Sequence, residues 1–320
     1  MKVVVTGGAG FIGSHVVDAL VARHDDVVVV DNLSSGIAAQ VHPAARLYTL
    51  NVEDASFATV CQREHPRVII HLAAQISVRN SLLNPLEDAQ TNILGTLNVL
   101  QAAATCGAVQ VISASSGGAL YGDTAPLPTP ETCVPAPQSP YGVSKLCGEH
   151  YLTYYNQMVP TLRTTALRFA NVYGPRQNPH GEAGVVAIFM QQCREGQVAM
   201  IHGDGQQTRD FIHVQDVVAA TLLAVDASLT GAYNVGTGLE TSITTMYTQI
   251  ASLFGFFSAP RFGPAKVGEQ RRSALDASAL RAQGWAAPRS LSDGLHDTAT
   301  FFRDAAPSPE FGFRLAHTIV

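Results

Sequence analysis

A tyrosine and a lysine four residues apart, Tyr141 and Lys145, stand in the stretch SPYGVSK at residues 139–145. Two residues with this spacing share one face if the stretch is helical, as its Pro-Tyr start and apolar pattern indicate. A phenol has a pKa of about 10, and a neighbouring ammonium group lowers that pKa because it stabilises the phenolate. Such a tyrosine can take the proton of a sugar hydroxyl while hydride leaves the same carbon atom. The spacing is common by chance, so its meaning depends on the rest of the chain.

A glycine loop directly follows the apolar run KVVVT at residues 2–6. Gly7, Gly10 and Gly13 form a GxxGxxG pattern, which allows a tight turn, a close approach to a pyrophosphate and close packing of the following helix. The N-terminus of that helix directs free N–H groups toward the phosphates. Asp31 ends the next apolar run, where a carboxylate binds the ribose hydroxyls of adenosine and repels a 2′-phosphate. Together the loop and the acid predict NAD rather than NADP.

Apolar β-branched runs alternate with amphipathic stretches over the first part of the chain. The amphipathic stretches predict helices at 12–23, 54–65, 85–106 and 141–158. The apolar runs predict strands at 2–7, 26–31, 46–52, 67–73, 109–115 and 163–170. Continuous apolar strands that alternate with helices are typical of a parallel sheet covered on both faces. The predicted fold class is therefore α/β, with a Rossmann-type doubly wound parallel sheet.

The alternation loosens after about residue 175, which predicts a smaller α/β substrate-binding lobe interleaved with the first sheet. Its expected elements are helices at 184–195, 214–226 and 242–254 and short strands at 198–202 and 232–236. We therefore expect an NAD-binding domain at 1–175, with returning segments near 205–237, and a mainly nucleotide-sugar-binding lobe at 176–320. The Pro-rich stretch 125–140 is interpreted as a loop, and the last residues show no clear period.

Composition excludes several classes of function. The chain has 320 residues, 46% of them apolar, and a net charge of −5 without any basic run, so we expect no nucleic-acid partner. No apolar run approaches the length that a membrane span requires, and no cleavage-site pattern marks a signal peptide. The histidines show no metal-binding pattern. The cysteines also lack metal spacing, so we expect no metal and a cytoplasmic protein with reduced thiols at Cys61, Cys106, Cys133, Cys147 and Cys193.

Eight blocks of sequence, in order, carry a resemblance that covers roughly residues 1–290. The chain resembles the extended short-chain dehydrogenase/reductase superfamily, and within it the UDP-glucose 4-epimerase-like enzymes of the NAD-dependent epimerase/dehydratase family. The blocks are TGGAGFIGSH (6–15), DNLSSG (31–36), HLAAQISVRNS (71–81), SSGGALYG (115–122), SPYGVSK (139–145), RFANVYGPRQ (168–177), GDGQQTRDFIHVQDV (203–217) and NVGTG (234–238).

The resemblance implies roles for the residues that could do chemistry. Tyr141 would be the base, and Lys145 would hold the nicotinamide ribose. A Ser or Thr usually hydrogen-bonds the same sugar hydroxyl, but its usual position is occupied by Gly117. Members with a similar block carry Ser or Thr one residue earlier, so Ser116 is expected in this role, with Ser115 as the alternative.

The resemblance also implies a set of residues that bind NAD. A departure occurs at Asn51-Val52, where the family usually has Asp followed by an apolar residue. The expected NAD-binding residues are Gly7, Gly10, Phe11, Ile12, Gly13, Asp31, Asn32, Ser35, Gly36, Asn51, Val52, Leu72, Ala73, Ala74, Gln75, Asn92, Ser115, Tyr141, Lys145 and Phe169.

For the substrate, the resemblance implies a nucleotide sugar whose diphosphate is neutralised by arginines, because a guanidinium group donates two parallel hydrogen bonds. A lid is expected at 178–189. The residue seven positions after Lys266 is bulky in epimerases that exclude N-acetyl groups, and here it is the small Ser273. The expected substrate-binding residues are Ser77, Ser116, Asn171, Val185, Phe189, Arg209 and Arg271.

The block around Gly118 distinguishes types of reaction within the family. Dehydratases carry an Asp-Glu pair before the block's tyrosine, and nucleotide-sugar decarboxylases carry a Glu, whereas this chain has Gly118-Ala119-Leu120-Tyr121. The expected function is therefore an NAD-dependent UDP-glucose/UDP-galactose 4-epimerase that works through a 4-keto sugar. Two alternatives are a 4-epimerase of a UDP-N-acetylhexosamine or UDP-uronate and a non-catalytic NAD-binding protein. The resemblance also implies a homodimer that pairs the helices at 85–106 and 141–158.

Overall fold

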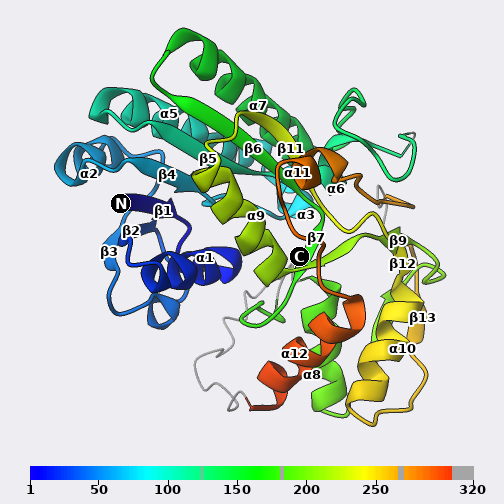
Figure 1. The fold of residues 1–320 in the computed structure, drawn as a ribbon. Coiled ribbons are helices and arrows are strands. Elements are labelled where there is room, and N and C mark those ends of the chain that lie inside the picture. Colours follow the sequence, from blue (N-terminus) through cyan, green and yellow to red (C-terminus); the bar gives the residue numbers. More distant parts are fainter. Residues whose placement is uncertain (124, 181–183, 266–269, 305–320) are drawn as a thin grey trace, which may run out of the picture.

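The computed structural model describes residues 1–123, 125–180, 184–265 and 270–304. Seven parallel strands form its central sheet in the order β11-β6-β5-β4-β1-β2-β3 (Figure 1). The predicted α/β class and parallel sheet are confirmed, and the strand order reverses between β1 and β4, where dinucleotides bind in this architecture. The strands are β1 (Lys2–Thr6), β2 (Asp26–Asp31), β3 (Arg46–Thr49), β4 (Val68–His71), β5 (Gln110–Ser116), β6 (Arg163–Phe169) and β11 (Gly231–Val235).

Helices cover both faces of the sheet, because successive side chains of each strand point to opposite faces. Val3 and Val5 face a core that includes α1 (Phe11–Ala22) and α9 (Val214–Asp226), whereas Val4 faces the core on the other side. The second face is covered by α2 (Ser56–Glu64), α5 (Gly95–Cys106) and α7 (Pro140–Met158) (Figure 1). Strands that are apolar on both sides therefore lie inside a doubly wound sheet.

The predicted helix 85–106 is one helical run with an irregular turn in it. It consists of α4 (Pro85–Ala89), a π-helical turn, η2 (Gln90–Leu94), and α5. A π turn holds one extra residue, so it changes the direction of the side chains that follow. The buried Asn92 lies in this turn.

A second group of elements forms the smaller lobe, with its own apolar core, at the bottom of Figure 1. Its helices are α8 (Val185–Arg194), α10 (Ile243–Leu253) and α12 (Leu291–Asp304). Three two-stranded pairs accompany them: β8 (Met200–His202) with β13 (Arg261–Gly263), β9 (Thr208–Arg209) with β12 (Thr241–Ser242), and β10 (Phe211–His213) with β7 (Asn171–Tyr173). The division into domains at residue 175 stays a prediction.

Several short elements escape the sequence patterns because they hold too few residues to show a period. They are η1 (Ala38–Gln40), α3 (Val78–Leu83), α6 (Gly117–Leu120) and α11 (Ser278–Ala282). In the part of the chain that the structure describes, no helix is both long and apolar enough to cross a membrane.

A buried ion pair fixes α7 on the sheet. Ser139 caps the helix by accepting the N–H of Gly142 at 3.2 Å, with Pro140 in the first turn. Further along α7, Glu149 accepts from Arg168 of β6, with 2.6 Å between Oε2 and Nη2 and 3.0 Å between Oε1 and Nε. Ser115 of β5 donates to the same carboxylate at 2.6 Å. The helix is therefore tied to two neighbouring strands by charged hydrogen bonds away from water.

We expect Arg168→Met to lower the free energy of unfolding by about 3–5 kcal/mol, because the buried Glu149 would lose its cation. Urea unfolding followed by circular dichroism measures the change. Arg272→Met is the matched control, since the exposed Arg272 pairs with Glu240 near the surface, and its loss should cost no more than about 1 kcal/mol. Equal effects of the two substitutions would contradict a special role for the buried pair.

Candidate active site

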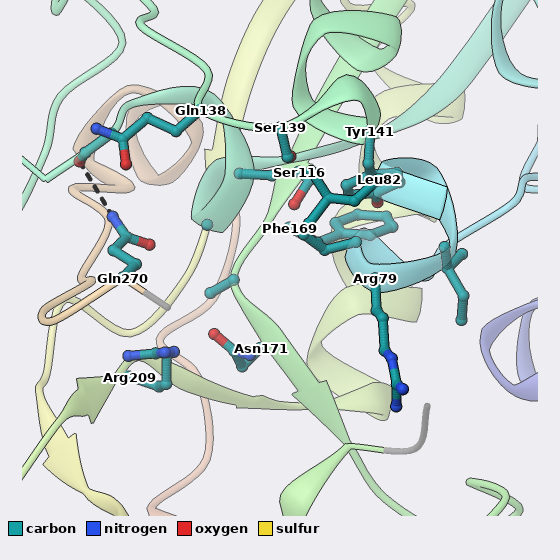
Figure 2. A pocket seen from close by; sticks show the side chains of 16 residues that line it. Arg79, Leu82, Ser116, Gln138, Ser139, Tyr141, Phe169, Asn171, Arg209 and Gln270 are labelled. Carbon is teal, nitrogen blue, oxygen red and sulfur yellow. Dashed lines mark hydrogen bonds between the residues drawn. The ribbon is translucent and has the colours of Figure 1, made fainter. Parts of the chain in front are cut away.

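A cavity of about 640 Å³ opens where the carboxyl ends of β5 and β6 meet the smaller lobe. Ligands of open α/β sheets bind at this edge. Figure 2 shows Ser116, Tyr141 and Phe169 gathered in one part of the view, with Asn171 and Arg209 in another. The cavity is lined by Ile76, Val78, Arg79, Leu82, Ser116, Gly118, Ala119, Gly122, Gln138, Ser139, Tyr141, Phe169, Ala170, Asn171, Arg209 and Gln270.

Tyr141 and Lys145 lie together on the first turns of α7, as their spacing predicts. The Nζ of Lys145 is 5.8 Å from the centre of the Tyr141 ring and donates to the carbonyl of Ala114 at 3.2 Å. Burial lowers the pKa of Lys145 to about 8, while the carboxylates of Asp88 and Glu149 oppose that shift. The lysine therefore keeps its charge at neutral pH in a site where water is scarce.

Burial raises the pKa of Tyr141 to about 12, and the charge of Asp88 adds to this rise. A hydrogen bond from the side chain of Ser116 acts in the opposite direction. In these surroundings the phenol is protonated near neutral pH, and positive charge beyond that of Lys145 is required before it can act as a base.

Ser115 and Ser116 point in different directions, since they are neighbours on a strand. Ser116 lines the cavity and hydrogen-bonds Tyr141, whereas Ser115 donates to Glu149 at 2.6 Å. The placement favours Ser116 over Ser115 for the hydroxyl that works with Tyr141.

The glycine loop is packed so closely that side chains would not fit. Gly7 has a φ of +70°, and a Cβ there would lie 2.7 Å from the backbone nitrogen of Ala73. A Cβ on Gly13 would lie 2.0 Å from the carbonyl oxygen of Gly7, so the start of α1 rests directly on the loop. This bare backbone at the start of a helix, at the point where the strand order reverses, fits a dinucleotide pyrophosphate.

Asp31 holds the loops beside the glycines. Its Oδ2 accepts the N–H of Ala9 at 3.0 Å, and its Oδ1 accepts the N–H of Leu33 at 2.9 Å. Gly36 approaches so closely that a Cβ there would lie 2.8 Å from Asp31 Oδ1. The carboxylate therefore stands at the end of β2 next to the glycine loop, where the NAD hypothesis requires it.

The other predicted NAD residues lie along the same edge of the sheet. Asn32 donates to Asn51 at 3.0 Å, and Val52 is buried. The N–H groups of Leu72 and Ala73 are both 3.2 Å from the hydroxyl of Thr6. The remainder are placed by their elements: Phe11 and Ile12 begin α1, Ser35 and Gly36 follow β2, Ala74 and Gln75 follow β4, and Asn92 lies in η2.

The structure brings only part of the predicted substrate set to the cavity. Asn171 and Arg209 line it. Arg271 instead forms two hydrogen bonds with Asp204 at the surface, at 2.8 and 2.9 Å, and lowers the pKa of Asp204 to about 2. Ser77 caps α3 by accepting the N–H of Asn80 at 2.8 Å. Substrate contacts of Arg271 and Ser77 therefore stay predictions.

The predicted lid and the predicted size filter are only partly covered by the structure. Residues 181–183 of the lid and Lys266 lie outside the described residues. Phe189 is buried against Tyr247, with 5.3 Å between ring centres, and Val185 begins α8. Val185, Phe189 and Ser273 are all absent from the described lining of the cavity, and Ser273 is buried.

Some lining residues were missed by the motif argument. Arg79 and Leu82 belong to α3, and Arg79 stands only two positions after the predicted Ser77 in the same sequence block. Gln138 directly precedes the SPYGVSK block, and Gln270 donates to the carbonyl of Gly122 at 3.1 Å (Figure 2). Proximity to the blocks was the signal for Arg79, Leu82 and Gln138, whereas Gln270 lies far from every block in the sequence. No group of three or more metal-ligating side chains occurs among the described residues.

Known proteins are similar to this chain over nearly its whole length. The UDP-glucose 4-epimerase of Mycolicibacterium smegmatis is 42% identical over 311 residues, which cover 95% of this chain and 99% of that protein. The structure of UDP-glucose 4-epimerase with UDP-glucose from Thermotoga maritima matches with a TM-score of 0.93 and 42% identity, over 95% of this chain and 99% of that one. The Thermus thermophilus UDP-glucose 4-epimerase complex with NAD matches with a TM-score of 0.90 and 39% identity, over 96% of this chain and 100% of that one.

The sequence profile of the NAD dependent epimerase/dehydratase family matches residues 3–236, a span that runs from β1 to the end of β11. The profile therefore covers the glycine loop, Ser116, Tyr141 and Lys145 together. The resemblance and the cofactor predicted from the sequence are confirmed, and the chain belongs to the NAD dependent epimerase/dehydratase family.

Proposed function

We propose that the protein is an NAD-dependent 4-epimerase that interconverts UDP-glucose and UDP-galactose. The observation that carries the proposal is the composition of the cavity, which unites Ser116 and Tyr141 but has no carboxylate among its described lining residues. Elimination or decarboxylation would call for an acidic residue there. Oxidation and re-reduction at a single carbon atom require only the tyrosine, the serine and the cofactor. The similarity to UDP-glucose 4-epimerases supports the same assignment.

When bound, NAD would supply the hydride acceptor and hydride donor for C4 of the sugar. Tyr141 takes the proton of the 4-hydroxyl group and later gives a proton back to the 4-keto sugar. Ser116 orients that oxygen through its hydrogen bond to Tyr141. Lys145 holds a positive charge 5.8 Å from the phenol ring, which favours the phenolate.

The substrate is anchored away from the reacting carbon. Asn171 and Arg209 line another part of the cavity and suit the diphosphate, because amide and guanidinium groups donate hydrogen bonds to phosphate oxygens. With binding energy concentrated on the nucleotide, the sugar can turn over between the two hydride transfers. The glycine loop and Asp31 would bind the pyrophosphate and adenosine ribose of NAD.

A second candidate is a 4-epimerase of a UDP-N-acetylhexosamine or a UDP-uronate. The cavity of about 640 Å³ leaves room for a larger sugar, and Arg79 adds a cation to its lining that would suit a carboxylate. A substrate panel of UDP-glucose, UDP-N-acetylglucosamine and UDP-glucuronate, followed by NMR of the anomeric protons, separates these possibilities. A non-catalytic NAD-binding protein would convert none of them.

We also infer a homodimer, because two exposed stripes on neighbouring helices are rich in apolar side chains. One runs along α7 and includes Val143, Tyr154 and Met158, and the other includes Leu86 of α4 and Leu94 of η2. Residues that repeat every three or four positions form one continuous face of a helix. Exposed apolar faces of this kind mark protein–protein contacts.

A cytoplasmic location and the absence of a nucleic-acid partner complete the proposal. All five cysteines are free thiols, and cytoplasmic proteins keep their thiols reduced. The net charge of −5 repels phosphate backbones. These inferences rest on chemistry alone.

We expect Tyr141→Phe to reduce turnover of UDP-glucose by at least about 1,000-fold, because the ring keeps its packing but loses the proton acceptor. NMR of the anomeric protons, with no NAD added, measures interconversion by the purified protein. Binding of UDP to the variant, measured by calorimetry, should match the wild type. Full activity of the variant would refute the assignment of the base.

The two serines give a matched pair of substitutions. Ser116→Ala should lower kcat by about 100-fold, since the hydrogen bond to Tyr141 and the substrate oxygen is lost. Ser115→Ala should change kcat much less and should instead lower the free energy of unfolding, because Ser115 donates a hydrogen bond to the buried Glu149. Measured kcat values and urea unfolding curves distinguish the two roles. The reverse pattern would assign the catalytic hydroxyl to Ser115.

The dimer can be tested with a charge on the apolar stripe of α7. Tyr154→Glu should convert the protein to a monomer in analytical ultracentrifugation, because a carboxylate in a close apolar contact is costly. Phe257→Glu is the control, since Phe257 is highly exposed and lies outside both stripes. A wild-type protein that sediments as a monomer would overturn the inference.

A further inference from the structure

Asp88 of α4 is a fully buried carboxylate that is absent from the described lining of the cavity. Its Oδ1 accepts from Gln75 Nε2 and from Asn92 Nδ2, both at 2.9 Å, and its Oδ2 accepts from the hydroxyl of Ser144. Within the described ranges no Lys, Arg or His comes within salt-bridge distance of it. Three hydrogen bonds, and no paired cation, therefore hold this charge in the interior.

The three donors belong to three separate elements of the active site. Gln75 follows β4, Asn92 lies in the π turn η2, and Ser144 directly precedes Lys145 on α7. Asn92 also forms two hydrogen bonds with the backbone of Gln75, accepting its N–H at 3.0 Å and donating to its carbonyl at 2.9 Å. Asp88 thus joins the loop and the turn expected at the cofactor to the helix that carries the reacting groups.

The hydrogen bonds alone do not require a carboxylate at this position. An asparagine could accept from Gln75 and Asn92 with its carbonyl oxygen and donate to the hydroxyl of Ser144 with its amide. Burial of a charge without a salt bridge costs more free energy than burial of an amide. The charge itself therefore needs an explanation beyond packing.

The charge of Asp88 acts on both reacting groups, since it raises the pKa of Tyr141 and the pKa of Lys145. The carboxylate of Glu149 also raises the pKa of Lys145, but it is paired with Arg168. Asp88 has no such pairing, so its effect is not cancelled nearby.

Other titratable groups around Tyr141 and Lys145 do not cancel the effect of the Asp88 charge. His71 of β4 faces Lys145, and burial lowers its pKa to about 3, so it is neutral at working pH. Arg79 of α3 is exposed at the cavity. Tyr121 donates its hydroxyl proton to Asn234 and accepts from Arg168. Of the described carboxylates that act on Tyr141 and Lys145, Asp88 is the one without a paired cation.

We propose that Asp88 is a positioning residue whose negative charge sets the pH range in which Tyr141 and Lys145 work. The proposal rests on the proposed epimerase function for its kinetic reading. The charge of Asp88 keeps Lys145 protonated despite burial. The same charge holds Tyr141 in the protonated form until the complete active site is assembled. Through Gln75, Asn92 and Ser144 the same carboxylate couples that charge to the loops expected at the cofactor.

The test is Asp88→Asn, which keeps the shape and can keep the three hydrogen bonds. Loss of the charge should move both limbs of the kcat/KM profile to lower pH, by about half a pH unit or more, because Tyr141 and Lys145 would both lose their protons more easily. The ionisation of Tyr141 should move in the same direction. It is measured by tyrosinate absorbance, as the difference between each protein and its Tyr141→Phe form.

Two controls separate charge from structure. Glu87→Gln removes an exposed carboxylate from the same helix and should leave both limbs in place. Asp88→Ala removes the hydrogen bonds as well, and it should lower retained NAD and kcat at every pH. An Asp88→Asn profile with wild-type limbs and an unchanged tyrosine titration would overturn the proposal. The titration needs no turnover, so it still decides the question if the protein epimerises no UDP-sugar.

Discussion

The active site depends on keeping an ammonium group and a phenol side by side where water is scarce. Burial alone favours a neutral Lys145 and a protonated Tyr141. Catalysis by Tyr141 as a base requires the opposite: a charged lysine and a phenol that can lose its proton. Two carboxylates, Asp88 and Glu149, oppose the loss of the proton from Lys145 by raising its pKa. Because Glu149 is also the anchor of α7, through Arg168, the position of the helix and the charge of its lysine are set together.

Epimerisation places a further demand on this site, because the same tyrosine must accept a proton and then return it. A group that acts first as base and then as acid works best when its pKa lies near the working pH. Opposing influences on the phenol therefore suit the reaction better than one strong influence. Burial and Asp88 raise the pKa of Tyr141, whereas Ser116 lowers it. A permanent acid or base in the lining, as in an elimination enzyme, would favour one direction.

Much of the fold could be predicted because its strands are buried on both faces and therefore read as continuous apolar runs. β1 and β2 match their predicted runs to within a residue, and α7 begins one residue before its predicted start and ends at its predicted end. The π turn at Gln90–Leu94 could not be predicted, since its extra residue does not alter the apolar pattern of a helix. Short elements such as α3 show too few residues for any period.

The sequence predicted which residues belong to the site better than it predicted where their side chains lie. The resemblance implies a diphosphate contact for Arg271, yet its side chain reaches Asp204, because an exposed carboxylate lies within reach of the long arginine. Asp88 lacks any motif of its own, and only its burial and its donors reveal it. Sequence patterns reveal motifs and local periodicity. They do not reveal hydrogen-bond partners that lie on distant segments of the chain and meet only in the folded protein.

Ser115 and Ser116 show how the carboxyl end of one strand supports two tasks at once. Adjacent residues of a strand face opposite sides, so the strand that presents Ser116 to the cavity must present Ser115 to the helix behind it. Ser115 then stabilises the anchor of α7, and α7 presents Tyr141 to Ser116. A shift of β5 by one residue would exchange these directions and separate the hydroxyl from the phenol. The register of the sheet is therefore itself a condition for the chemistry, which ties the active site to the core on both faces.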